Sequence, residues 1–68
     1  MKISARNQLK GKITGITKGA TTAHVTIDIG GATVTASITN AAVDELGLKE
    51  GKAAYAVVKA SDGMIAVD

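Results

Sequence analysis

Several residue types are missing from this 68-residue chain or are nearly so. It contains no cysteine, proline, phenylalanine or tryptophan, one tyrosine (Tyr55) and one histidine (His24). Without cysteine there is no disulfide, and one histidine without a thiolate argues against a structural metal site. No stretch approaches the roughly 20 apolar residues of a membrane helix. Because Arg6, Asn7 and Gln8 also interrupt any signal-peptide pattern, we expect a soluble, cytoplasmic protein with no membrane partner.

The hydrophobic core must therefore be built from small and aliphatic side chains. Hydrophobic residues make up 46% of the chain, which excludes a disordered polypeptide, yet twelve of them are alanine. Below about 70–80 residues a single core rarely contributes more than about 3–5 kcal/mol. Residues 1–68 are expected to form one domain, and oligomerisation is the remaining common way to stabilise it.

Alternating apolar and polar residues predict three strands in the first half of the chain. The first covers residues 9–17, where Gly11 and Gly15 either weaken it or let another backbone approach closely. The second and third cover residues 22–29 and 33–38. A Gly-Gly pair between them is a strong signal for a two-residue hairpin.

The hydrophobic period changes after the third strand and predicts a short helix. Thr39 or Asn40 can cap its N-terminus, and Asp44 and Glu45 would suit its first turns. Gly47 would end it as the residue after the C-cap.

Two more strands are predicted, over residues 52–59 and 64–67. The first of these is apolar on both faces, one with Tyr55 and one with Ala56, which implies burial of one face in the core and of the other in a subunit contact. Three strands, one short helix and two more strands form the order of an all-β, five-stranded OB-like barrel. From the pattern alone, an SH3-like barrel or an open meander is the competing fold.

A candidate binding site lies just before the first strand. Ser4 and Arg6 are two residues apart, so in an extended backbone both side chains project to the same side. A hydroxyl and a guanidinium without an acidic neighbour suit an oxyanion. A second basic cluster, Lys59-Ala60-Ser61, lies near the other end of the chain. From the pattern alone, Arg6 can equally be a solvated arginine near a chain end, and Lys59 is more often an exposed lysine at the end of a strand.

The segment Ser4-Ala5-Arg6-Asn7-Gln8-Leu9-Lys10-Gly11 closely resembles the opening of the molbindins, the small molybdate-binding Mop proteins. Lys59-Ala60-Ser61 lies where that family places its other anion-binding segment, and the resemblance covers the whole chain. It implies an OB-like barrel, a homohexamer built as a trimer of dimers, and intracellular storage of molybdate, with tungstate as a near-isostere. It implies no catalytic activity and no cofactor.

The resemblance also implies which residues contact the oxyanion. Ala5 would act through its backbone N–H, and Thr39 lies at a helix start whose free N–H groups favour anions. Asn7 is expected to hold the turn, and Ala42 replaces a serine that relatives often carry, so one side-chain donor is absent. The predicted contacts come from Ser4, Ala5, Arg6, Thr39, Lys59, Ala60 and Ser61.

Other functions are weaker alternatives. An OB-type nucleic-acid binder fits the fold and the net charge of +2, but such surfaces stack bases on aromatic side chains and this chain offers only Tyr55. A regulatory or transporter-associated domain split from a larger chain would explain no feature better, since no DNA-binding helix or nucleotide motif is present. An enzyme is the least favoured class, because no nucleophile–base pair is found. His24 has no nearby partner, so a solvent or interface role is preferred.

Overall fold

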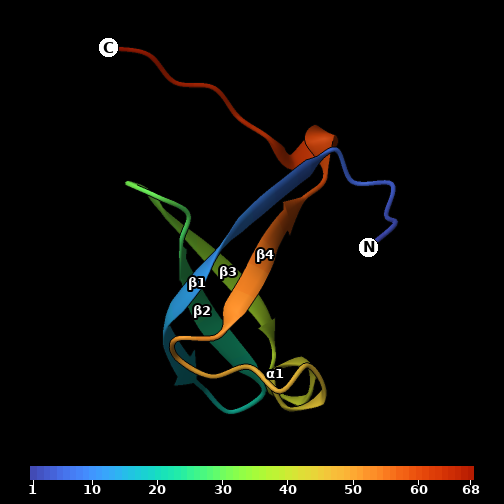
Figure 1. Cartoon of the computed structure of the whole chain (residues 1–68), viewed down its shortest axis with the longest axis vertical. Helices are drawn as coiled ribbons and strands as arrows, with labels where there is room; N and C mark the ends of the chain where they lie inside the picture. The colour runs from blue at the N-terminus through green and yellow to red at the C-terminus, as the bar shows by residue number, and fades with distance from the viewer.

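The computed structural model describes all 68 residues and shows a single curled sheet with one short α-helix (Figure 1). The four strands follow the order β3-β2-β1-β4, and all neighbours are antiparallel. A helix follows β3, and a 3₁₀-helix follows β4. The elements are β1 (Asn7–Lys18), β2 (Thr22–Asp28), β3 (Thr33–Thr39), α1 (Asn40–Glu45), β4 (Ala53–Val58) and η1 (Ala60–Asp62). The all-β class, the first four strands and the helix are confirmed, with ends shifted by one or two residues.

The predicted fifth strand is wrong for the single chain. Residues 64–68 form no strand and no backbone hydrogen bond, and Met64, Ile65 and Val67 are 93%, 94% and 91% exposed. A strand must pair its N–H and C=O groups, and this tail finds no partner within its own chain. The sheet therefore ends at β3 on one side and at β4 on the other, and the five-stranded barrel is not closed.

The curl of the sheet comes from the long first strand. Residues 7–12 of β1 pair with β4, and residues 12–18 pair with β2. Thr14 is an extra residue in the second ladder, because Ile13 pairs with Ile27 and Gly15 with Thr26. Such a bulge bends a strand and increases its twist. Because β1 pairs with β4 along its first half and with β2 along its second half, it runs through both parts of the curled sheet.

The hairpin between β2 and β3 is as predicted. Gly30 and Gly31 have φ values of +92° and +90°, a backbone region that side chains with a Cβ rarely adopt. The Asp28 carboxylate accepts a hydrogen bond from the Gly30 N–H at 2.9 Å, and the Ile29 N–H donates to the Ala32 carbonyl at 2.9 Å. These contacts fix the register of the two strands.

The core is small and aliphatic. It contains six buried residues, and the predicted apolar face of β2 supplies three of them. Val43 of α1 covers one end of the sheet, and Ala56 is the buried residue of β4. With so few buried side chains, each worth at most about 1.5–3 kcal/mol, the isolated chain is marginal. The six are Ile13, Ala23, Val25, Ile27, Val43 and Ala56.

The acidic residues of the helix lie elsewhere than expected. Because α1 has only six residues, Asp44 and Glu45 lie at its end, and its first turn contains no acidic residue. Gly47, with φ +62°, follows the C-cap as predicted. Lys52 Nζ donates to the carbonyl oxygens of Leu46 and Gly47 at 3.0 and 3.1 Å and so neutralises the negative end of the helix. No helix in the structure has the length and apolar character needed to cross a bilayer.

The two faces of β4 differ in exposure. Ala56 is buried in the core, but Tyr55 and Val57 on the other face are 49% and 39% exposed. Only one of the two faces is therefore buried within a single chain, and the expected subunit contact over the other face stays a prediction. The outward face of β4 is an apolar surface that the single chain leaves uncovered.

Candidate oxyanion-binding site

The segment that precedes β1 is bent and not extended as expected. The backbone bends at Ser4 and at Arg6, and Arg6 Nε donates a hydrogen bond to the Ser4 carbonyl oxygen at 3.0 Å. Gln8 Nε2 donates to the Ala5 carbonyl at 2.9 Å and fastens the segment to the start of the strand. The premise of an extended backbone fails because β1 begins only at Asn7. Arg6 nevertheless stays beside Ser4, and the terminal nitrogens of its guanidinium make no hydrogen bond within the chain.

The basic cluster from the other end of the chain, Lys59-Ala60-Ser61, begins next to this segment. Asn7 at the start of β1 pairs with Val58 at the end of β4, so Arg6 and Lys59 each lie one residue beyond a paired position. The Asn7 side chain also donates to the Val58 carbonyl at 3.2 Å, as expected of a residue that holds this region together. The topology thus brings both predicted clusters to one end of the β1–β4 ladder (Figure 1).

Neither cation at this end has an acidic partner. The ion pair of the structure joins Lys18 Nζ to Asp44 Oδ1 at 2.8 Å, at the α1 end of the sheet. Arg6 and Lys59 are both exposed and form no salt bridge. Two unneutralised cations beside serine hydroxyls form a surface that favours an anion with several acceptor oxygens.

Thr39 lies at the opposite end of the sheet. It pairs with Thr22, next to the Lys18 end of β1, whereas Arg6 precedes the Asn7 end of the same 12-residue strand. Figure 1 shows α1 far from the N-terminal segment and from η1. The predicted site residues therefore form two separate groups, and one small anion cannot touch both groups of the same chain.

The helix start near Thr39 is partly occupied by its own hydrogen bonds. Thr39 Oγ1 accepts from the Ala42 N–H at 3.0 Å, and the Asn40 N–H donates to the Thr21 carbonyl at 2.9 Å. The N–H groups of Asn40 and Ala42 are therefore already bonded and are not free for an anion, contrary to expectation. Thr39 itself is exposed, and its hydroxyl hydrogen can still point to a ligand while its oxygen caps the helix.

His24 lies outside both groups. It is exposed on β2, where it pairs with Thr17 on one side and Ser37 on the other. No group of three or more His, Cys, Asp or Glu side chains is arranged to hold a metal ion. His24 therefore has hydroxyl neighbours and no ligand set.

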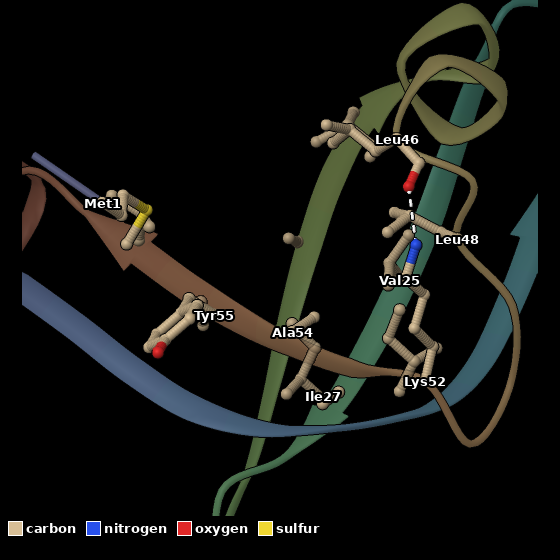
Figure 2. A pocket seen from close by; sticks show the side chains of 14 residues that line it. Met1, Val25, Ile27, Leu46, Leu48, Lys52, Ala54 and Tyr55 are labelled. Atoms are coloured by element: carbon tan, nitrogen blue, oxygen red, sulfur yellow. Dashed lines mark hydrogen bonds between the residues drawn. The ribbon is translucent and has the colours of Figure 1, made fainter. Parts of the chain in front are cut away.

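The one cavity of the structure is a groove that sequence analysis did not foresee. It has a volume of about 470 Å³, and 13 of its 14 lining residues are hydrophobic. Figure 2 shows Val25 and Ile27 between Met1 and Tyr55 at one end and Leu46 and Leu48 at the other. Lys52 is its only charged lining residue, and its ammonium is engaged at the C-terminus of α1. The apolar character of both faces of β4 was the signal in the sequence.

Comparisons with known proteins agree on one family. The model of the TOBE domain matches residues 3–65. A probable molybdenum-pterin-binding protein of Haemophilus influenzae is 55% identical over 69 residues, covering 100% of both chains. The solved structure of MopII from Clostridium pasteurianum has a TM-score of 0.90 and 52% identity, covering 97% of this chain and 100% of that one. A molybdate-binding protein from Sporomusa ovata has a TM-score of 0.93 and 36% identity, covering 98% and 100%.

Proposed function

The chain belongs to the TOBE domain family and, within it, to the molybdenum-pterin-binding Mop proteins, and we propose that it binds molybdate as a free oxyanion. The observation that carries the proposal is the pairing of β1 with β4. This pairing places Arg6 and Lys59, two cations without acidic partners, at the same end of one ladder. The role is binding and not catalysis, with tungstate as a second ligand of nearly the same shape.

The chemistry of the site follows from its donors. Arg6 and Lys59 neutralise the two negative charges, and the hydroxyls of Ser4 and Ser61 add neutral donors. The backbone N–H groups of Ala5 and Ala60 complete the predicted shell. Phosphate is largely protonated at neutral pH and needs an acceptor that such a site does not offer, so it is selected against. Sulfate is a dianion too, and only the size of the site can distinguish it.

The site is proposed to form between subunits. Thr39 lies at the far end of the sheet from Arg6 and Lys59, so it reaches the same anion only when it comes from another copy. The exposed apolar face of β4, with Tyr55 and Val57, is available for such contacts. The assembly is a homo-oligomer, a hexamer by its family resemblance, and its role is intracellular storage and homeostasis of molybdate.

The shape of the molecule favours a free oxyanion over a pterin conjugate. A pterin carries several hydrogen-bonding groups around a flat ring and needs polar partners when buried. The only cavity is lined by hydrophobic residues, and its single lysine is already bonded to the end of α1. We therefore place the ligand at the exposed basic end of the β1–β4 ladder and not in the groove.

The stability of the assembly tests whether the binding sites lie between subunits. Molybdate at a hundredfold excess over its dissociation constant is expected to stabilise the assembled form by about 2.7 kcal/mol per site. The measurements are the melting temperature and the rate of subunit exchange between labelled and unlabelled protein, with sulfate and phosphate as controls. If molybdate binds tightly yet does not slow subunit exchange, the sites lie within single chains.

A histidine substitution tests the placement of the polar face of β2. His24→Ala is expected to change the molybdate affinity by less than about 1 kcal/mol, the usual effect of a surface substitution. His24 has only hydroxyl-bearing neighbours in the sheet and lies outside both groups of site residues. Isothermal titration calorimetry provides the comparison. A tenfold loss of affinity would mean that β2 contributes to the site.

Nucleic-acid binding remains the second candidate, and one observation favours it. Tyr55 is 49% exposed and lies opposite Lys10 in the β1–β4 ladder, so an aromatic ring and a cation share one face. A single aromatic side chain can stack only one base, which is weak for an OB-type surface. A salt titration of oligonucleotide binding separates the two functions, because phosphate contacts give a steep dependence on salt concentration.

A further inference from the structure

The segment that precedes β1 is held in place by very few hydrogen bonds. Residues 1–6 take part in no backbone–backbone hydrogen bond, so the ladders of the sheet give this segment no support. Two side-chain bonds hold it, and they end on consecutive carbonyl oxygens. Arg6 Nε donates to the Ser4 carbonyl at 3.0 Å, and Gln8 Nε2 donates to the Ala5 carbonyl at 2.9 Å. The first bond lies within the segment, so the second is its only hydrogen bond to the rest of the chain.

We propose that Gln8 is a positioning residue of the anion site and that it acts by fixing the peptide unit between Ala5 and Arg6. This inference rests on the proposed function. Gln8 belongs to β1, and its backbone pairs with Val57 of β4. Its amide group is therefore anchored on a rigid element, and groups supported by such elements hold a binding geometry better than groups on loops.

The bond to the Ala5 carbonyl also sets the direction of the next N–H group. The chain has no cis peptide bond, and in a trans peptide unit the C=O and the N–H point in opposite directions. Because the Ala5 carbonyl is turned toward Gln8, the Arg6 N–H points away from it. That N–H makes no hydrogen bond within the chain. Gln8 thus occupies a carbonyl oxygen, which would repel an anion, and leaves a donor free on the residue that carries the positive charge.

The position of the Arg6 guanidinium depends on the same bond. The bond from Arg6 Nε to the Ser4 carbonyl spans only two residues, so it keeps the two together but does not fasten either of them to the sheet. Asn7 cannot replace Gln8 in this role, because its side chain donates to a carbonyl of β4. Ordering a loose segment at the moment of binding costs conformational entropy, and a segment that is already ordered avoids that cost.

Three variants test whether Gln8 acts in this way. Gln8→Met keeps a side chain of similar length but has no donor, and Gln8→Asn keeps the amide on a side chain that is one methylene too short. Thr14→Val is the matched control, because it also removes a side-chain hydrogen bond of an exposed residue of β1, the 2.9 Å contact between the Thr14 and Thr26 hydroxyls. Isothermal titration calorimetry measures the molybdate affinity. Relaxation of ¹⁵N measures the order of the Ala5 and Arg6 N–H groups in the absence of molybdate.

We expect both Gln8 variants to bind molybdate about tenfold more weakly than the parent chain, because the anion must then order the segment itself. In the same variants, the order parameters of the Ala5 and Arg6 N–H groups should fall from the rigid value of about 0.85 to below about 0.6. Thr14→Val should leave the affinity and both order parameters unchanged, even where it lowers the melting temperature.

Three results would overturn the inference. The first is an affinity of the Gln8 variants within about twofold of the parent. The second is a loss of affinity with unchanged order parameters, because Gln8 would then contact the anion directly. The third is an equal loss of affinity in Thr14→Val, which would show a general effect of stability. A parent chain that binds no molybdate would overturn the proposed function and this inference with it, whereas each of the three results leaves the proposed function standing.

Discussion

Arg6→Ala is expected to weaken molybdate binding by about 2–5 kcal/mol, which is roughly 30-fold to several thousand-fold in the dissociation constant. Arg6 has no acidic partner in the chain, so its charge is available to the anion. Its Nε is held by the Ser4 carbonyl, which fixes the direction of the guanidinium. Folding should be largely intact, because the side chain is exposed and contributes nothing to the core. Isothermal titration calorimetry on folded protein measures the effect.

Three further variants make this result specific. Lys59→Ala should weaken binding less, because an ammonium is a point charge without the forked donors of a guanidinium. Arg6→Lys should give an intermediate loss for the same reason. Lys12→Ala removes one exposed positive charge from the middle of β1 and should have little effect. If Arg6→Ala and Lys59→Ala both leave the affinity unchanged, neither residue belongs to the site.

Local patterns were sufficient to predict most of the fold. In β2, Ala23, Val25 and Ile27 alternate with polar residues, and all three are buried as that period requires. Gly30 and Gly31 adopt the positive φ values that the hairpin needs. The last strand could not be placed in the same way. Its apolar residues suggested a buried strand, but a strand forms only where another strand offers hydrogen-bond partners, and residues 64–68 meet no such strand within the chain.

In the candidate site too, contacts between residues close in the sequence could be predicted, whereas the positions of residues far apart in the sequence could not. Ser4 and Arg6 are close in the sequence, so their association was predictable, although the backbone bends at both residues and is not extended as expected. The proximity of Lys59 follows only from the antiparallel pairing of Asn7 with Val58. The separation of Thr39 likewise depends on strand order, which no local pattern encodes.

Gly11→Ala is expected to prevent stable folding. A Cβ at this position would overlap the Asp28 carbonyl oxygen and would lie 2.9 Å from both the Asp28 carbonyl carbon and Ile27 Cγ2. The first two are backbone atoms of β2, so they cannot rotate away as a side chain can. Overpacking typically costs about 1–3 kcal/mol and more where nothing can yield. A core of this size contributes only about 3–5 kcal/mol, so the loss approaches the whole stability.

This outcome would also confirm the close backbone approach that a glycine within a strand can indicate. Gly63→Ala is the matched control, because its added Cβ would meet only the Ala60 carbonyl oxygen at 3.4 Å, an ordinary contact, and its φ is −73°. Circular dichroism during thermal unfolding compares the two variants with the parent chain. Gly63→Ala should melt within a few degrees of the parent, whereas Gly11→Ala should show no cooperative transition. A cooperative Gly11→Ala transition close to that of the parent would mean that β1 and β2 can separate locally without loss of the sheet, and that the bulge at Thr14 absorbs the strain.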